Sequence, residues 1–342
     1  MSFSVGIVGL PNVGKSTLFK ALTKKEVAIA PRPFTTINPN VGKVFVPDKR
    51  LEQIADVVKP EKKTPTVIEF VDIAGLVKDA HRGEGLGNQF LAQIRNCDAI
   101  LEIIRAFESP GVENVLGQIA PQKEIQVLSL ELLMKDLETL EKSISKLEKK
   151  RDKKLSKKLA VLKKIKEKVS QGKLIAQLEL SNEEILETQG YQTLTGKPTL
   201  YVLNINGKTS FEDPKHKYLT LNLKEEEEML ELSAEEKKEL QVQSHLDRLI
   251  AACYNILDLI TFFTVAGEKE VRAWTIVRGS AAKKAAGIVH SDFEQKFIKA
   301  DVVGWQGLVN CRSWSKAREK GLIKTVGKDY IIQDGDVIEF KI

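Results

Sequence analysis

The sequence predicts an α/β fold: a mostly parallel sheet covered by helices, with a helical hairpin inserted and a small α+β unit at the end. Three observations support this fold class. Apolar, β-branched runs alternate with helix-like stretches over the first third of the 342 residues. Leucine and isoleucine then recur at heptad spacing over residues 133–147. After Gly267, short strand-like runs return.

The sheet is predicted from strand-like runs in the first third of the chain and again after residue 198. A helix-like stretch, Lys15–Thr23, follows the first run, and strands separated by helices favour parallel pairing. The return of strand signals after the hairpin makes the hairpin an insertion within one α/β domain. The runs are Ser4–Leu10, Val41–Val46, Val67–Ile73, Ala99–Ile104, Thr199–Asn206 and Leu219–Leu223.

The hairpin is predicted from a leucine seam that is interrupted once. The spacing breaks at residues 149–154 and then resumes, which indicates two antiparallel helices with a tip near Arg151 and Asp152. Two heptads per arm are too few for a free coiled coil, so the hairpin is expected to pack on a core. The seam consists of Leu133, Leu137, Leu140, Ile144 and Leu147, then Leu155, Leu159 and Leu162.

The later part of the chain predicts further helices and a terminal strand pair. Ser233 with Glu236 fits a capping box that opens a helix. The remaining predictions are helices over His245–Leu259 and Asp292–Ile298, a strand over Val271–Val277, and a strand pair formed by Tyr330–Ile332 and Val337–Ile342. We therefore expect one domain made of residues 1–124 and 197–262, a helical insertion at 125–196, and a C-terminal unit at 263–342.

Composition excludes several classes of protein. Hydrophobic residues make up 42% and charged residues 29% of the chain, which is typical of a globular protein. No apolar run reaches the roughly 18–20 residues of a membrane span. Cys97, Cys253 and Cys311 lie far apart, so a disulfide framework or a zinc knuckle is not expected and a cytoplasmic location is predicted.

The positive charge of the chain is concentrated in the hairpin. The net charge is +6, whereas residues 142–168 hold thirteen basic and three acidic residues, a local charge of +10. This stretch contains no aromatic residue, so stacking on bases is not expected. Phosphate contacts to structured RNA or the ribosome are one interpretation, and a solvated charged face is the other.

A phosphate-binding loop gives the strongest signal. Gly9–Ser16 matches G-x-x-x-x-G-K-[ST] between a strand and a helix, as that motif requires. The two glycines allow a tight loop whose N–H groups face phosphates, and the helix directs its positive end at them. Lys15 is expected to reach the β- and γ-phosphates, and the Ser16 hydroxyl to bind Mg²⁺.

Two further segments fit a nucleotide switch. Asp72 ends an apolar strand and begins the pattern D-x-x-G, which places Asp72 near Mg²⁺ and the Gly75 N–H near the γ-phosphate. Between this segment and the phosphate loop, Thr35 and Thr36 offer adjacent hydroxyls, one of which could complete the Mg²⁺ shell. The alternative interpretation of the segment with Thr35 and Thr36 is an ordinary threonine-rich turn.

The sequence resembles the Obg-like ATPase (YchF) family of translation-factor-related P-loop NTPases over nearly its whole length. The motifs that carry the resemblance are Gly6–Thr17, Phe70–Lys78, Gly83–Leu91, Lys269–Ile276, Asp329–Ile331 and Asp334–Val337.

The resemblance implies a G domain with a helical insertion and a C-terminal ubiquitin-like TGS domain. It also implies hydrolysis of ATP, sometimes of GTP, and association with ribosomes. Nucleotide would sit on Asn12, Val13, Gly14, Lys15, Ser16 and Thr17, and Mg²⁺ on Ser16 and Thr36.

The position of the water-orienting group departs from the Ras-like pattern. Ras-like GTPases place a glutamine directly after D-x-x-G, whereas this chain has Leu76, a replacement that the YchF family shares. His81 is a candidate for orienting the attacking water. The other predicted catalytic residues are Lys15 and Gly75. A surface histidine on a glycine-rich loop is the favoured alternative for His81.

The base-recognition segment departs from the GTPase pattern. GTPases end this strand with N-K-x-D, but here the segment reads Asn204, Ile205, Asn206 and Gly207, without a carboxylate. A site without that acceptor has no basis for preferring guanine. Asn204 and the backbone around Ile205 are the predicted base contacts.

Asn12 has two interpretations. In potassium-stimulated relatives of this class, an asparagine at this loop position helps to hold a monovalent cation such as K⁺ beside the phosphates. Alternatively, Asn12 shapes the loop.

The sequence thus predicts a monomeric, Mg²⁺-dependent nucleoside triphosphatase that hydrolyses ATP, and GTP as well, and acts at the ribosome. The alternative is an RNA- or ribosome-binding module whose bound nucleotide regulates shape with negligible turnover. No membrane partner is expected.

Overall fold

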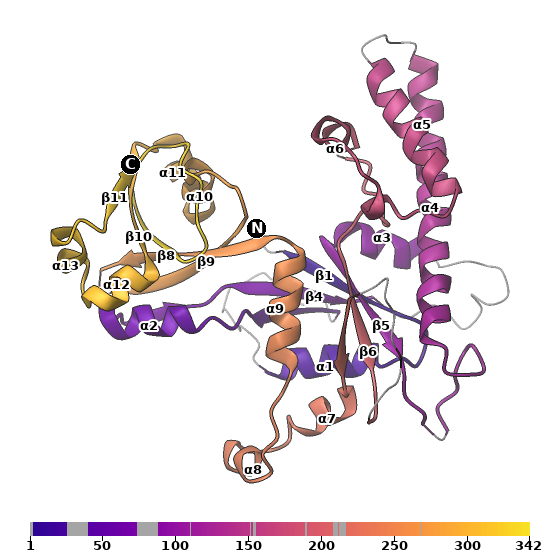
Figure 1. Cartoon of the computed structure of the whole chain (residues 1–342), viewed down its shortest axis with the longest axis horizontal. Helices are drawn as coiled ribbons and strands as arrows, with labels where there is room; N and C mark the ends of the chain where they lie inside the picture. Colours follow the sequence, from indigo (N-terminus) through magenta and orange to yellow (C-terminus); the bar gives the residue numbers. More distant parts are fainter. Residues whose placement is uncertain are drawn as a thin grey trace.

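Two six-stranded sheets organise the described residues in the computed structural model, and Figure 1 shows them next to each other. The structure describes residues 3–25, 40–73, 88–109, 111–150, 152, 155–188, 190–207, 211, 217–267 and 269–342. Among the helices in these ranges, none is both long and apolar enough to cross a membrane.

The first sheet has the strand order β2-β4-β1-β5-β6-β7. All its neighbouring strands are parallel except β2, which runs antiparallel to β4. Each strand lies within one of the predicted runs or extends beyond it by one residue, so the predicted mostly parallel sheet is confirmed. The strands are β1 (Ser4–Val8), β2 (Val41–Phe45), β4 (Val67–Asp72), β5 (Ala99–Arg105), β6 (Thr199–Asn204) and β7 (Tyr218–Leu221).

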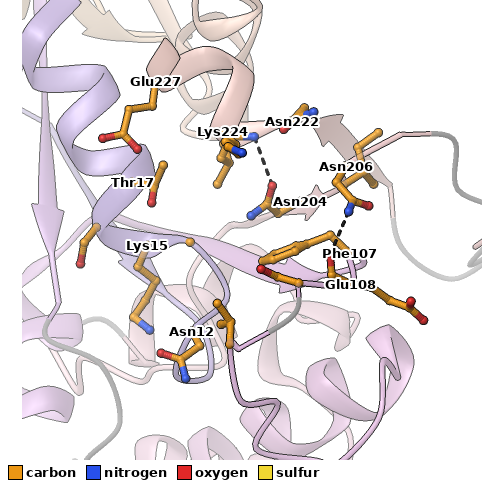
Figure 2. Close-up of a pocket in the computed structure, with 16 residues that line it drawn as sticks. Asn12, Lys15, Thr17, Phe107, Glu108, Asn204, Asn206, Asn222, Lys224 and Glu227 are labelled. Carbon is orange, nitrogen blue, oxygen red and sulfur yellow. Dashed lines mark hydrogen bonds between the residues drawn. The ribbon is translucent and has the colours of Figure 1, made fainter.

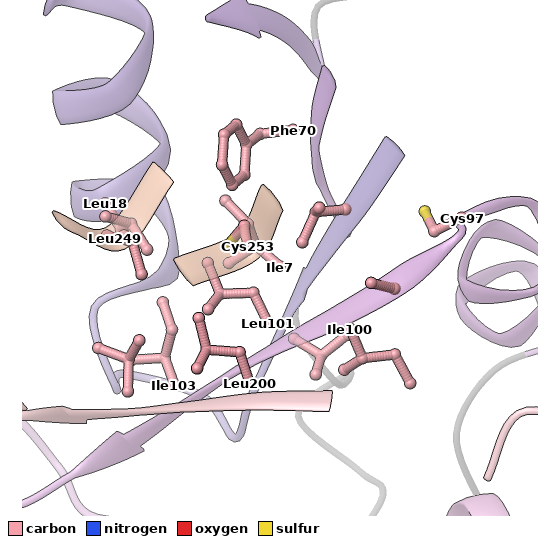
Figure 3. Close-up of a cluster of buried hydrophobic side chains, with 14 of the residues drawn as sticks. Ile7, Leu18, Phe70, Cys97, Ile100, Leu101, Ile103, Leu200, Leu249 and Cys253 are labelled. Carbon is pink, nitrogen blue, oxygen red and sulfur yellow. The ribbon is translucent and has the colours of Figure 1, made fainter. Parts of the chain in front are cut away.

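Helices cover both faces of this sheet. Figure 3 shows Leu18 of α1 and Leu249 of α9 against Leu101 and Ile103 of the central strand β5. On the other face, Ile125 of α4 packs with the alternate residues of β5 and β6. The helices around the sheet are α1 (Lys15–Lys25), α3 (Asn88–Asn96), α7 (Leu223–Glu228), α8 (Ala234–Glu239) and α9 (Leu246–Ile256).

The predicted helical hairpin is confirmed. Helix α4 (Pro121–Lys150) and helix α5 (Ser156–Ser170) pack along the leucine seam and project from the sheet (Figure 1). Asp136 of α4 is fully buried and accepts hydrogen bonds from the N–H groups of Leu194 and Thr195, both at 2.8 Å. These bonds fix the base of the hairpin. Two short helices, η3 (Ile175–Gln177) and α6 (Asn182–Thr188), follow it.

The second sheet has the strand order β11-β10-β12-β8-β9-β3. Its long antiparallel pair β8–β9 buries Phe262 and Phe263 on opposite faces, each in a core of its own. The strands are β3 (Lys62–Thr64), β8 (Leu259–Ala266), β9 (Glu270–Val277), β10 (Lys299–Gly304), β11 (Lys324–Val326) and β12 (Asp336–Lys341). The helices are α2 (Lys49–Val58), α10 (Ala282–Val289), α11 (Ser291–Gln295), α12 (Trp305–Cys311) and α13 (Trp314–Glu319).

The predicted terminal strand pair is wrong. β12 pairs antiparallel with β10 and parallel with β8, whereas Ile331 forms a single bridge with Ala281. The turn before β12 is closed instead by Asp336, whose carboxylate accepts hydrogen bonds from the Tyr330 hydroxyl and the Gln333 N–H. Local β-propensity could not reveal that the last strand joins the middle of the sheet.

Two predicted helices end earlier than expected. The helix predicted over His245–Leu259 is α9, which stops at Ile256, because Asp258 takes a left-handed backbone conformation (φ 50°) and strand β8 begins one residue later. The helix predicted over Asp292–Ile298 is the shorter α11. The capping box of Ser233 and Glu236 is present at the start of α8.

Residues 48–64 connect the two sheets, which no sequence pattern indicated. β3 pairs with β9, and Leu51 and Ile54 of α2 belong to the same buried cluster as Phe263. Arg50 forms ion pairs with Asp48 at 2.8 Å and with Asp334 of the last turn at 2.9 Å. An element from the first third of the chain is thereby part of the C-terminal sheet, and the domain boundaries at 124, 196 and 262 stay a prediction.

Candidate nucleotide-binding site

The phosphate-loop motif forms the turn between β1 and α1. Gly9 has φ 150° and Gly14 has φ 106°, a region that favours glycine. A Cβ on Gly9 would lie 2.5 Å from the carbonyl oxygen of Ile103, and one on Gly14 would lie 2.6 Å from the Asn204 amide nitrogen. Both glycines are therefore required by space as well as by backbone conformation.

Lys15 is held inside this loop. Its side chain is buried, and Nζ donates hydrogen bonds to the carbonyl oxygens of Gly9 (3.1 Å) and Leu10 (2.8 Å). Burial lowers the pKa of Lys15 to about 8, while the negative charges of Asp72 and Glu124 act in the opposite direction. The ammonium is thus placed at the loop with few solvent contacts, where phosphate oxygens can replace the two carbonyls (Figure 2).

Asp72 and Ser16 are the described candidates for a metal site. Asp72 ends β4 opposite Ile7 of β1, at the edge where the phosphate loop begins. Burial raises the pKa of Asp72, and the positive charge of Lys15 opposes that rise. The Ser16 side chain is exposed to the cavity above the loop.

The described residues contain no group of three or more His, Cys, Asp or Glu side chains that could hold a metal. A hydroxyl and a single carboxylate suit Mg²⁺ that takes its other ligands from phosphates and water. The other residues predicted for this chemistry, Thr36, Gly75 and His81, lie outside the described residues.

Asn204 joins three parts of the site. Its amide nitrogen donates to the carbonyl oxygen of Val13 at 2.9 Å, and its amide oxygen accepts from the N–H of Leu223 at 3.2 Å. The side chain is 5% exposed. Because an amide has two donors and two acceptor positions, one of each is left for a base. Asn204 therefore has a structural role in addition to its predicted contact with a base: it positions the phosphate loop relative to the end of β6.

The loop, the end of β6 and the start of α7 enclose a cavity of about 620 Å³. A cavity of this size is within the range of cofactor and substrate sites. It lies at the carboxyl ends of the parallel strands, the usual ligand position in such sheets. The lining residues are Asn12, Gly14, Lys15, Ser16, Thr17, Phe107, Glu108, Ser109, Val112, Asn204, Ile205, Asn206, Asn222, Leu223, Lys224 and Glu227.

The cavity wall formed by Phe107, Glu108, Ser109 and Val112 was not predicted from the sequence. Arg105, which ends β5, donates hydrogen bonds to the carbonyl oxygens of Phe107 (3.2 Å), Val112 (3.1 Å) and Glu113 (3.1 Å). Its guanidinium also lies 4.6 Å from the centre of the Phe107 ring. The signal that could have found this wall is its place directly after a central parallel strand.

Asn12 takes part in the same arrangement. It has a left-handed backbone conformation (φ 63°), and its amide nitrogen donates to the carbonyl oxygen of Glu113 at 3.2 Å. The amide group therefore ties the phosphate loop to the wall, and its oxygen accepts no hydrogen bond from a described residue. This geometry is compatible with both interpretations of Asn12.

The base-facing edge lacks a carboxylate at Gly207. Asn206 donates from its amide to the carbonyl oxygen of Glu108 at 2.9 Å, which closes the edge between β6 and the wall (Figure 2). Two glutamates line the cavity elsewhere. Glu227 pairs with Lys20, and the Glu108 carboxylate points away from Asn204 in Figure 2.

Two protein-family models match parts of the chain. The family model MMR_HSR1, described as "50S ribosome-binding GTPase", matches residues 4–164, and the model YchF-GTPase_C, described as a "protein of unknown function", matches residues 259–342.

Curated relatives match the whole chain. The protein called "Ribosome-binding ATPase YchF" is 43% identical in Haemophilus ducreyi, over 100% of this chain and 99% of that protein. The proteins of the same name in Bacillus subtilis and Escherichia coli O157:H7 are also 43% identical, over 100% and 99% of this chain and 99% of each relative.

A solved structure has the same fold. The structure of the Schizosaccharomyces pombe YchF GTPase superposes with a TM-score of 0.89 at 33% identity, and the match covers 99% of this chain and 98% of that chain.

Proposed function

The chain belongs to the YchF family of P-loop nucleoside triphosphatases, and on this premise we propose that it is a Mg²⁺-dependent ATPase switch that works at the ribosome. The observation that carries the proposal is the cavity above Lys15. It combines a complete phosphate loop with a base edge that has no carboxylate at Gly207. The first feature holds a triphosphate, and the second removes the usual preference for guanine.

Each predicted site residue has a task in this proposal. The N–H groups of residues 12–17 and the Lys15 ammonium bind the phosphate oxygens, and the wall held by Arg105 encloses the rest of the nucleotide. Ser16 and Asp72 would hold Mg²⁺ together with Thr36. When bound, Mg²⁺ neutralises charge on the β- and γ-phosphates. Gly75 and His81 stay proposals for the γ-phosphate contact and the orientation of water.

Paired affinity measurements test the choice of nucleotide. We expect ATP to bind at least as tightly as GTP in titrations of the full chain with Mg²⁺. A tenfold or greater preference for GTP, about 1.4 kcal/mol, would contradict the proposal.

Lys15→Ala tests the assignment of the site. It removes the cation that offsets the crowded phosphate charge, and we expect it to abolish ATP hydrolysis and to weaken triphosphate binding severely. Wild-type turnover in a pure preparation of this variant would refute the site.

Exchange of K⁺ for Na⁺ in the same assay with the wild-type protein tests Asn12 as a cation ligand, since only a held cation makes turnover depend on the ion.

Ribosome association is proposed from two sources. The three relatives described above carry the name "Ribosome-binding ATPase", and the hairpin of this chain concentrates a charge of +10. The partner chemistry is therefore ribosomal or other structured RNA, and a monomer in the cytoplasm is the proposed working state. Co-sedimentation of the protein with ribosomes, with and without ATP, tests this association.

The alternative of a binding module with negligible turnover makes a different prediction. Such a module would release no phosphate above background, with or without ribosomes. The ATPase names of the relatives favour turnover. Measured phosphate release under both conditions separates the two.

A further inference from the structure

The lysines of the hairpin fall into two groups that the sequence does not distinguish. Helix α5 carries six lysines. Lys168 is partly buried and forms no ion pair with a described residue. Of the other five, four face a glutamate, and Lys158 lies 5.1 Å from the centre of the Tyr191 ring. These side chains are engaged within the protein. The ion pairs are Lys157–Glu183 (2.6 Å), Lys163–Glu148 (2.7 Å), Lys164–Glu184 (2.6 Å) and Lys166–Glu141 (3.0 Å).

Helix α4 presents a different set. Lys142, Lys146 and Lys149 are exposed and make no ion pair with any described residue. Their spacing of four and three residues places them on one side of the helix. That side is opposite Ile144, which is buried against α5. The exposed Ser145 lies among them, and we call these four residues the α4 lysine face.

The acidic residues of the same stretch do not neutralise this face. Glu141, which lines the same shallow depression as the four residues, is held across the hairpin by Lys166. Glu148 is held in the same way by Lys163. Glu138 pairs with Lys135 at 3.0 Å rather than with Lys142. Lysines of α5 thus neutralise Glu141 and Glu148 of α4, and the α4 lysine face is left without an ion pair to any described residue.

We propose that the α4 lysine face binds the phosphate backbone of folded RNA. The proposal deepens the proposed function, because it rests on ribosome association and names the surface and the chemistry. Three ammonium groups spread over about 10 Å of helix, at 1.5 Å per residue, and a serine hydroxyl are donors that phosphate oxygens accept. Residues 142–168 hold no aromatic side chain to stack on unpaired bases, so a double-helical segment fits better than a single strand.

A pair of charge-matched variants of the full chain tests the proposal. The first is the triple variant Lys142→Gln, Lys146→Gln and Lys149→Gln, which removes all three positive charges of the α4 lysine face. The control is Lys157→Gln, Lys158→Gln and Lys164→Gln, which removes the same charge from the side that faces α6 and Tyr191. Binding to an RNA duplex of about 20 base pairs and to purified ribosomes is measured as a function of salt.

We expect the first variant to lose at least tenfold in affinity for both probes. The slope of log affinity against log salt should become shallower by two to three, because each released phosphate contact contributes roughly 0.9 on duplex DNA and RNA should be similar. The control should stay within about twofold of the wild type, a difference of only some 0.4 kcal/mol. Thermal melting of both variants verifies that the leucine seam still folds.

A second arm uses the neutralised glutamate. Lys166→Gln frees the Glu141 carboxylate beside the face and should weaken RNA binding, and adding Glu141→Gln should restore it. Rescue by removal of a carboxylate is not expected from a structural defect in the hairpin.

The contrary outcomes are distinct. Equal losses in the first variant and the control would show that net charge alone matters and would overturn the proposal. Unchanged binding of both probes by the first variant would show a solvated face. Loss of ribosome binding with unchanged duplex binding would identify an acidic protein surface as the partner. ATP hydrolysis without RNA should be equal in the wild type and in all variants. If the wild type hydrolyses no ATP, the proposed function is refuted, whereas the RNA-binding role of the α4 lysine face is not.

Discussion

Glu124, in the first turn of helix α4, accepts a hydrogen bond from the backbone N–H of Arg105 at the end of β5, at 2.9 Å. The Glu124 side chain is buried, and burial raises its pKa to about 7, although the Arg105 and Lys15 charges lower it. Glu102, on the same strand as Arg105, is also buried, and its burial and the nearby Glu124 charge raise the pKa of Glu102 well above its ordinary value. The start of the hairpin therefore meets the nucleotide cavity wall through a carboxyl group that titrates near neutral pH.

Glu124→Gln should stabilise the protein at pH 8. The pKa of Glu124 is higher in the folded state (about 7) than its ordinary value of 4.5, so folding loses stability as the pH rises from 4.5 through 7. By the usual 1.36 kcal/mol per pH unit, the cost above pH 7 is about 3 kcal/mol. Glutamine keeps the acceptor for Arg105 without the charge.

We expect Glu124→Gln to have a higher melting temperature than the wild type at pH 8 and nearly the same melting temperature at pH 4.5. The exposed Glu179→Gln is the control, and an equal gain at both values would exclude the titration of Glu124.

Arg105→Lys should raise the KM for ATP more than it lowers kcat. Arg105 touches no nucleotide in this proposal and acts by holding the wall through three carbonyls. Lysine keeps the positive charge but lacks the planar guanidinium group, whose several N–H donors reach the three carbonyls together. Loss of one or two such bonds, roughly 1.5–3 kcal/mol each, predicts at least a tenfold higher KM. Steady-state kinetics over a range of ATP concentrations measures it, with Arg278→Lys, an exposed ion-paired arginine, as the control. A fall in kcat at constant KM would contradict a positioning role.

Gly207→Asp should shift the preference between nucleotides toward GTP. It restores the carboxylate position of the N-K-x-D pattern, which accepts two hydrogen bonds from guanine. Gly207 has φ 152°, so any side chain strains this loop, and absolute affinities will fall for both nucleotides. The ratio of the GTP and ATP dissociation constants removes this common strain. Gly207→Asn carries the same strain without the charge and should leave the ratio near that of the wild type. An unchanged ratio in Gly207→Asp would show that the base edge is recognised elsewhere.

ATP binding should weaken as the pH rises above about 8. The free protein holds Lys15 with a pKa of about 8, and triphosphate binding requires the charged ammonium. Binding above this pH must therefore take up a proton, which costs up to tenfold in affinity per pH unit. Titration calorimetry between about pH 7.5 and 9.5 in buffers of different ionisation enthalpy measures the affinity and the proton uptake. AMP, which lacks the phosphates that Lys15 reaches, is the control. A flat profile for ATP would show that the lysine stays charged in the free loop.

The strands and the hairpin could be predicted from the sequence because their signals are local. An alternating or continuous apolar run buries itself wherever the sheet forms, and the leucine seam of α4 and α5 contains its own packing partner. The phosphate loop is equally local, since Gly9, Gly14 and Lys15 act within one turn. These features place the triphosphate end of the site without any knowledge of the rest.

The sequence by itself therefore determined the fold class, the phosphate loop and the family. Only the tertiary structure decided which contacts complete the site and which charges are free. The wall after β5 depends on Arg105 reaching the carbonyls of Val112 and Glu113, and Asn204 meets Val13 from 191 residues away. The lysines of α4 and α5 are alike in sequence, but four of the six lysines of α5 pair with glutamates of α4 and α6, whereas Lys142, Lys146 and Lys149 of α4 pair with no described residue. Such pairings depend on which side chains the folded chain brings within a few ångströms, and composition and periodicity carry no record of them.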